Sequence, residues 1–138
     1  MTNQTPQTNR SEEQQQPLDL SRAKMILRVW AEANLLIGEL RIFGSYAKGT
    51  ASPDSDLDVA VRVVRKLPGD TSVWVTSLCE CPRWGEELSR ILGVKVDVQD
   101  ITGDHVSQFV QDASILIYQD EGKALRSVEA KHSSNEQK

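Results

Sequence analysis

The sequence predicts a small α/β domain with a single hydrophobic core, and three observations point to it. In some stretches apolar residues recur at three- and four-residue steps, which is typical of amphipathic helices. Other stretches are short and are β-branched or alternate between apolar and polar residues, which is typical of strands. The two kinds of stretch follow one another along 138 residues, of which 1–17 and 129–138 are mostly polar. The remaining segment, 18–128, is long enough for one domain and not for two.

The first part of the chain is expected to contain a polar tail, one helix and two strands. Residues 1–17 hold almost no apolar side chains, so nothing offsets the entropy of ordering them and we expect disorder. From residue 18 onward apolar residues keep helical spacing, after Asp19 or Ser21 as the N-cap, which predicts a helix that ends near Gly38. The next two apolar runs, at 40–43 and 57–64, are predicted strands.

The second part of the chain is expected to add three or four helices and two strands. Residues 71–92 have helical spacing, although Pro82 should kink the helix or divide it in two. Gly93 should close this helix, and the strict alternation of residues 94–98 predicts a half-buried strand. Further elements are predicted as a short helix at 105–113, a strand at 114–118, a helix that starts near Asp120, and a polar tail at 129–138.

A glycine-serine turn follows the first predicted strand. Gly44 would let the backbone turn sharply and would let amide groups approach a phosphate without an intervening side chain. The Ser45 hydroxyl can donate to the same phosphate oxygens, and Lys48 is a candidate third contact. Taken alone, Gly44 and Ser45 could form any turn at the end of a strand, and a single lysine in a polar loop is commonly just solvated.

Three aspartates form the second candidate feature. Asp56 and Asp58 lie two residues apart at the head of a predicted strand, so their carboxylates should share one face. Asp97 lies inside the otherwise apolar strand at 94–98, where an unpaired carboxylate is costly. If the two strands are neighbours, the three side chains form a carboxylate cluster suited to two Mg²⁺ ions. Without Asp97, the pair could simply be the solvated edge of a strand.

Together these residues resemble a known family. Gly44-Ser45, the later Asp56-x-Asp58 and the distant Val96-Asp97-Val98 are similar to the DNA polymerase beta superfamily of nucleotidyltransferases. The segment GSYAKGTASPDSDLD resembles the minimal nucleotidyltransferase (MNT) antitoxins of HEPN/MNT toxin–antitoxin systems, and the resemblance covers about residues 22–126. It implies a nucleotidyltransferase fold, with a small, mixed but mostly antiparallel sheet flanked by helices.

The resemblance also implies a reaction and roles for individual residues. Asp56, Asp58 and Asp97 would hold Mg²⁺, two ions in all, and Asp97 would also help to deprotonate the attacking hydroxyl. Ser45 would bind the outer phosphates of ATP, the substrate, with Gly44 and Lys48 as the other candidate nucleotide-binding residues. The net reaction would be transfer of AMP with release of pyrophosphate.

The acceptor of the nucleotide is expected to come from another molecule. After the last predicted strand only residues 119–138 remain, too few to build a second, substrate-binding domain. The resemblance implies that a partner HEPN ribonuclease toxin supplies a hydroxyl, that of a tyrosine, and that this chain acts as its antitoxin. Two alternatives remain open: transfer to a small molecule such as an aminoglycoside, and an antitoxin that neutralises its toxin by binding alone.

Composition disfavours several other kinds of protein. The formal net charge of −4 and the mixed signs of the charged residues leave no basic stripe, so direct nucleic-acid binding is not expected. Cys79 and Cys81 are too close in sequence for a mutual disulfide, and His105 and His132 lack the spacing of zinc ligands. No apolar run approaches the roughly 18 residues that a membrane span needs. We therefore expect a soluble protein of the cytoplasm.

Overall fold

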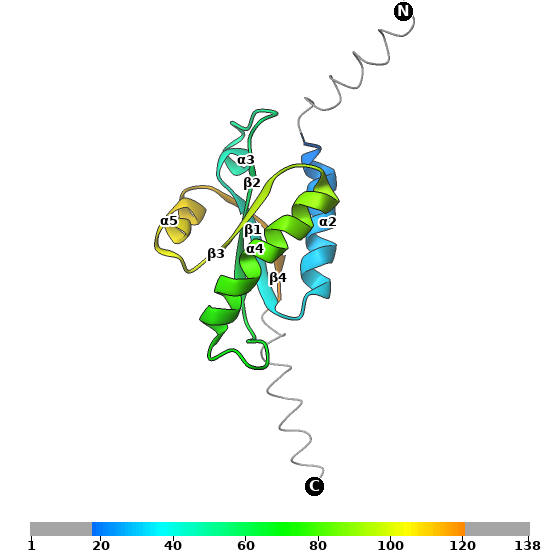
Figure 1. Cartoon of the computed structure of the whole chain (residues 1–138). Helices are drawn as coiled ribbons and strands as arrows, with labels where there is room; N and C mark the ends of the chain where they lie inside the picture. Colours follow the sequence, from blue (N-terminus) through cyan, green and yellow to red (C-terminus); the bar gives the residue numbers. More distant parts are fainter. Residues whose placement is uncertain (1–17, 121–138) are drawn as a thin grey trace, which may run out of the picture.

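The computed structural model describes residues 18–120, which form alternating helices and strands (Figure 1). The elements in chain order are α2 (Leu20–Ala33), β1 (Ile37–Phe43), α3 (Ser45–Lys48), β2 (Leu57–Val63), α4 (Val73–Leu92), β3 (Val96–Asp100), α5 (Asp104–Asp112) and β4 (Ser114–Gln119). The prediction of an α/β domain is thus confirmed. The two polar tails and the helix predicted to start near Asp120 lie outside the described residues.

The four strands form one mixed sheet in the order β3-β2-β1-β4. The central strand β1 runs antiparallel to both of its neighbours, β2 and β4. Only β2 and β3 are parallel, and α4 makes the crossover that joins them. The sheet is therefore mixed but mostly antiparallel, as the family resemblance implied.

Helices cover the two faces of the sheet unequally. In Figure 1, α2 and α4 lie on one side and α5 on the other. The main core lies on the side of α2 and α4, where Leu27 and Leu88 pack against strand residues such as Leu40 and Val59, all four fully buried. Such burial of aliphatic side chains contributes about 1.5–3 kcal/mol each. This face of the sheet holds the domain together.

The opposite face, which we call the open face, carries the alternate residues of the same strands. It includes Asp58, Ala60 and Arg62 of β2, and Glu39, Arg41 and Phe43 of β1, since residues two apart share a face. Only its centre is covered, where Val106 of α5 packs against Phe43 and Ala60 in a small second cluster. Polar and charged groups therefore occupy the two ends of the open face.

The first helix is shorter than the sequence predicted. Helix α2 begins after Asp19, which caps it as expected, but ends at Ala33 rather than near Gly38. Asn34 ends it: the Asn34 side chain accepts a hydrogen bond from the Leu36 amide at 3.0 Å, which bends the chain into a turn. Ile37 then starts β1, so its helical spacing from the residues of α2 was coincidental.

Two further boundaries differ from the prediction. Helix α4 is a single helix, not two, even though Pro82 lies inside it. Its buried residues on both sides of the proline, among them Cys81, Trp84 and Leu88, pack into the core and outweigh the loss of one backbone hydrogen bond. Strand β3 covers Val96–Asp100, two residues later than the predicted 94–98, because its pairing with β2 continues to Asp100.

Helix α4 depends on its N-cap, which gives a first prediction. The Ser72 hydroxyl accepts a hydrogen bond from the Val75 amide at 3.2 Å. Ser72→Ala should lower the free energy of unfolding by about 1 kcal/mol, because this amide loses its partner. Ser72→Asp keeps an acceptor at the same place and should preserve stability. Urea denaturation of both variants checks this, and an equal loss in the two would contradict the capping role.

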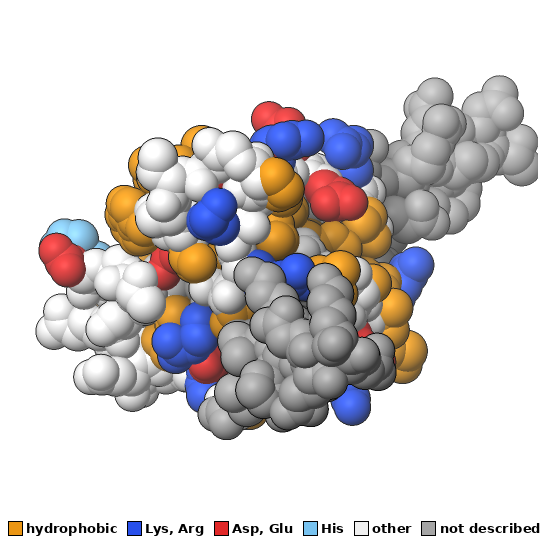
Figure 2. All heavy atoms as spheres, turned by 90° about the horizontal axis from the view of Figure 1, so that it is seen from below, with side chains coloured by type: hydrophobic (Ala, Val, Ile, Leu, Met, Phe, Trp, Pro, Cys, Tyr) orange, Lys and Arg blue, Asp and Glu red, His pale blue; other side chains and the backbone are white. Residues whose placement is uncertain are grey.

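No helix in residues 18–120 is long and apolar enough to cross a bilayer. On the face shown in Figure 2, basic and acidic side chains are interspersed with apolar ones, without a continuous basic stripe. Cys79 and Cys81 are both free thiols, with Cys79 exposed and Cys81 buried. Burial raises the pKa of the Cys81 thiol to about 11, so it stays protonated.

Candidate functional site

Asp58 and Asp97 lie side by side on the open face. Asp58 is the second residue of β2, and its partner in the parallel neighbour β3 is Asp97. On its other side Asp58 is paired with Phe43, the last residue of β1. Partners in register on adjacent strands are about 5 Å apart and point to the same face. The neighbouring strand that the sequence hypothesis required for Asp97 is therefore present.

The electrostatics of Asp58 show that the aspartates affect one another. Partial burial raises the pKa of the Asp58 carboxyl, and the negative charges of Asp97 and then Asp56 raise it further. The ionised form is thus disfavoured for lack of a compensating positive charge. A cation bound among these side chains would remove that cost.

Asp56 forms an ion pair with a lysine, while its charge still acts on Asp58. It lies just before β2, and its carboxylate pairs with the Lys95 ammonium at 3.6 Å. The Asp97 carboxylate accepts a hydrogen bond from the Gln99 side chain at 2.7 Å. Accordingly, no group of three or more Asp, Glu, His or Cys side chains within residues 18–120 is arranged to hold a metal ion. The structure brings two of the three predicted carboxylates together and pairs the third with a lysine.

The Asp56–Lys95 pair is a contact that sequence reasoning missed. The Lys95 side chain is 76% exposed and that of Asp56 is 44% exposed, so water screens the pair. Such an ion pair contributes about 0–1 kcal/mol, so little holds Asp56 in its present direction. The sequence held one indication of this contact: Lys95 lies one residue before β3, as Asp56 lies one residue before β2. In the structure the Lys95 carbonyl accepts a hydrogen bond from the Leu57 amide. Two parallel strands that start together bring these flanking residues into contact.

Gly44 makes room for the Asp58 carboxylate. Its backbone has φ 72° and ψ −149°, a conformation essentially restricted to glycine. A Cβ atom on Gly44 would lie 2.3 Å from one carboxylate oxygen of Asp58, far closer than atoms can approach. The sharp turn predicted from the sequence is thus confirmed, and it serves a second purpose: the missing side chain leaves space for the acid.

The turn after Gly44 presents backbone amides beside these carboxylates. Ser45 begins α3, and no side chain caps this short helix. The Lys48 amide donates to the Gly44 carbonyl at 3.0 Å, whereas the earlier amides of a helix have no intrahelical acceptor and can donate to another group. Ser45 itself is partly exposed. Amides and a hydroxyl next to paired acids suit a ligand that brings both phosphate and a cation.

Lys48 lies in the same turn but contacts a different element. Its ammonium pairs with the carboxylate of Asp112, the last residue of α5, at 3.4 Å. The two side chains are 45% and 64% exposed, so this pair is also a weak one. Lys48 therefore lies in the turn that follows Gly44, and its ammonium contacts α5.

The chemistry of the donors favours a hard cation. Asp56, Asp58 and Asp97 offer only carboxylate oxygens, and oxygen ligands are those that Mg²⁺ prefers. The other nearby acids do not join them. Asp54 is exposed in a turn, and Asp100 points to the other face, where it accepts a hydrogen bond from Ser77 of α4. The donor chemistry of the three aspartates thus fits Mg²⁺, although Asp56 is paired with Lys95 in this structure.

Comparison with known proteins identifies the family. The sequence profile of the nucleotidyltransferase domain matches residues 23–120. A search of curated protein sequences gave no match.

Solved structures share the fold at low sequence identity. A toxin–antitoxin complex with AMP-PNP contains a chain with TM-score 0.50 and 19% identity, covering 83% of this chain and 89% of that one. A chain from a mutant MntA–HpeT toxin–antitoxin complex has TM-score 0.52 and 18% identity, covering 82% and 88%. A chain of MntA–HepT has TM-score 0.50 and 16% identity, covering 86% and 92%. Since the profile also spans most of its sequence, the chain belongs to the nucleotidyltransferase domain family.

Proposed function

We propose that this chain is a Mg²⁺-dependent adenylyltransferase that transfers AMP from ATP to a tyrosine hydroxyl of a HEPN ribonuclease toxin, and so acts as its antitoxin. The observation that carries the proposal is the pairing of Asp58 with Asp97 directly beside the Gly44 turn. Paired acids and free amides are what nucleotidyl transfer requires, because the reaction joins a triphosphate, a divalent cation and a hydroxyl at one place.

Each residue has a defined part in the proposed reaction. The carboxylates of Asp56, Asp58 and Asp97 hold Mg²⁺, which supplies positive charge to offset that of the phosphates. The amides after Gly44 and the Ser45 hydroxyl bind the outer phosphates. Asp97 accepts the proton of the acceptor hydroxyl while the oxygen of that hydroxyl forms a bond to the α-phosphorus. The bond from that phosphorus to the bridging oxygen breaks, and pyrophosphate leaves.

The choice of ATP and of a toxin as acceptor draws support from the structural neighbours. Those neighbours belong to toxin–antitoxin complexes, one of them with AMP-PNP, an analogue of ATP. In this chain the acids lie at one end of an open sheet face, where a second protein can approach them. A cytoplasmic location would supply both ATP and the reducing conditions that suit two free thiols.

Two labels on ATP test the proposed reaction. The chain is incubated with Mg²⁺, a candidate HEPN protein and ATP carrying ³²P at either the α or the γ position. Label from the α position alone should appear on the HEPN protein, because AMP carries the α-phosphate and pyrophosphate takes the γ-phosphate away. EDTA should abolish the transfer. Label from the γ position would indicate a kinase instead, and unlabelled HEPN protein in both arms would refute the assignment.

Lys48 provides a finer prediction for the nucleotide-binding turn. Lys48→Ala should raise the KM for ATP several-fold, because the ammonium is close enough to the turn to move from Asp112 to a phosphate. Asp112→Ala breaks the same ion pair but leaves the lysine, so it should leave KM unchanged or lower it. Steady-state kinetics on the two variants checks this. An equal rise in KM for both would mean that the ion pair, and not phosphate contact, matters.

A further inference from the structure

A groove opens on the far end of the open face, away from the aspartates. Its floor is formed by Glu39 and Arg41 of β1 and by Arg62 of β2, and α5 provides one wall through Ser107 and Val110. Its volume is about 590 Å³, within the range of pockets that hold small molecules. None of the residues of the candidate transferase site lines it.

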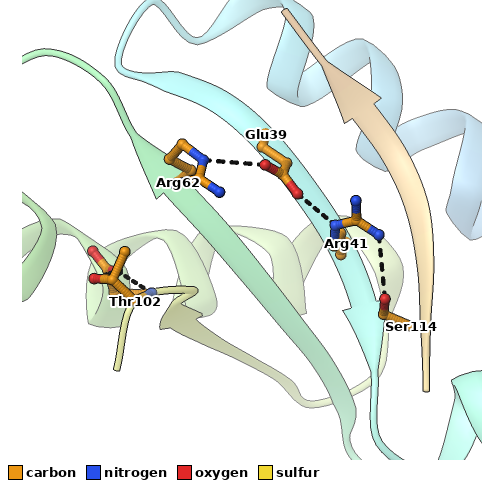
Figure 3. Close-up of polar contacts among 6 residues, drawn as sticks. Glu39, Arg41, Arg62, Thr102 and Ser114 are labelled. Atoms are coloured by element: carbon orange, nitrogen blue, oxygen red, sulfur yellow. Dashed lines mark hydrogen bonds and ion pairs between the residues drawn. The ribbon is translucent and has the colours of Figure 1, made fainter. Parts of the chain in front are cut away.

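The floor of the groove carries two positive charges and one negative charge. Glu39 is buried, with only 5% of its side chain exposed, and it accepts hydrogen bonds from the Nε atoms of both Arg41 and Arg62 (Figure 3). Burial raises the pKa of the Glu39 carboxyl, but the hydrogen bonds from Arg41 and Arg62 outweigh this effect and lower it overall. Glu39 is therefore ionised at neutral pH, and the cluster has a net charge of +1.

One arginine would be enough to neutralise Glu39. The second adds a positive charge and N–H donors that Glu39 does not use. Arg62 is half exposed, and within residues 18–120 its contact with Glu39 is made by Nε, at 3.1 Å, and not by its two terminal nitrogens. Arg41 uses one terminal nitrogen to donate to the Ser114 hydroxyl at 3.2 Å, as Figure 3 shows. Since that hydroxyl oxygen accepts, its own hydrogen remains free to donate. Glu39 thus orients two guanidinium groups that both line the groove.

The donors lie on more than one side of the groove. Arg62 comes from β2, Arg41 and Ser114 from β1 and β4, and Ser107 from the wall that α5 forms. A flat carboxylate is satisfied by one guanidinium fork, whereas a tetrahedral phosphate accepts from several directions. Next to the charged floor, Val110 and Ile101 give apolar surface for the remainder of a ligand.

We propose that this groove binds the phosphate group of a small phosphorylated molecule, with Arg41 and Arg62 on the phosphate. The site is separate from the aspartates, since Arg62 is four residues beyond Asp58 on β2, about 13 Å at the rise of a strand. Helix α5 packs on the sheet between them, over Phe43 and Ala60. Because arginines take the place of a cation, binding here requires no metal ion, unlike binding at the aspartates.

The test is a titration of the full chain in EDTA, followed by NMR of backbone amides and by calorimetry. The probes are AMP, inorganic phosphate, adenosine and acetate. AMP and phosphate should shift the amides of Arg41, Arg62, Ser107 and Ser114, whereas adenosine and acetate should not. Equal affinity for AMP and inorganic phosphate would support the proposal and would mean that the groove recognises the phosphate group alone. Tighter binding of AMP would support it with a phosphate ester as ligand.

Variants separate binding in this groove from general charge effects. Arg62→Gln should weaken AMP binding by about 10-fold or more, because it removes charge-assisted hydrogen bonds. Arg65→Gln makes the same charge change at an exposed position outside the groove and should leave binding unchanged. Asp54→Asn, which removes the charge of an exposed acid outside the groove, should also leave it unchanged.

Three results would overturn the proposal: acetate binding as tightly as phosphate, adenosine binding as tightly as AMP, or no shift of the groove amides in the parent chain on adding AMP and phosphate. The amide shifts of the parent chain need no variant, so they test the proposal even if Arg62→Gln does not fold. All these measurements omit metal and acceptor, so they stand apart from the transfer assay.

Discussion

Asp58→Asn should abolish nucleotidyl transfer while leaving the protein as stable as the parent or more so. The carboxylate of Asp58 lies in register with Asp97 and against Gly44, so its replacement removes the central group of the proposed Mg²⁺ site. Loss of one such group should lower the rate by at least about 10²-fold. Stability should not fall, because the raised pKa of Asp58 shows that its negative charge is unfavourable in the folded state, and asparagine removes that charge.

The measurements are the transfer rate with α-labelled ATP and thermal unfolding of the same samples. Asp54→Asn is the matched control, since Asp54 is an exposed acid of a nearby turn and makes the same change of charge. It should retain both activity and stability. An active Asp58→Asn protein would remove Asp58 from the reaction, and a marked loss of stability would show that its role is structural.

Gly44→Ala should cost both stability and activity. The backbone conformation at Gly44, with φ 72° and ψ −149°, costs any other residue about 1–3 kcal/mol. In addition, the new methyl group would lie 2.3 Å from an Asp58 oxygen, so the carboxylate must move away from its place beside the turn. We therefore expect a lower melting temperature, weaker Mg²⁺ binding by calorimetry, and transfer reduced to near background.

Gly49→Ala is the control that separates backbone strain from displacement of the Asp58 carboxylate. Gly49 ends α3 with φ 78° and ψ 18°, and a Cβ atom there meets nothing within 4 Å. This variant should lose about 1–2 kcal/mol through strain alone and should keep its activity below its melting temperature. If the two alanine variants lost activity equally, crowding of Asp58 would not be the reason.

Local sequence was sufficient to predict most elements of the fold, and its failures share a cause. Helical periodicity located α4, which has one buried face, and a run of apolar β-branched residues located β2. It failed at the end of α2, where Ile37 continued the helical spacing by chance while the Asn34 side chain turned the chain. It also failed at Pro82, where packing of the whole helix against the core outweighed a local preference.

The candidate site was predictable in part for the same reason. Residues within a single strand or turn could be placed from spacing alone, as Gly44 and Asp58 were. The pairing of Asp58 with Asp97 needed the strand order, which spacing does not give, although the apolar neighbours of Asp97 indicated a strand. The partner of Asp56 and the Arg41–Glu39–Arg62 cluster depend on contacts between strands and were missed.

Strand β1 has a consequence for how this protein would tolerate mutation. Its inward residues, Leu40 and Ile42, are fully buried in the main core, while Glu39 and Arg41 face outward and Gly44 follows its end. In a pooled library scored separately for cellular abundance and for activity, substitutions at 40, 41 and 42 should alternate in phenotype, because of these three only Arg41 is not buried. Those at 40 and 42 should deplete the protein itself. Those at 41 should leave its amount nearly normal, so the abundance score should recover at 41 between two losses.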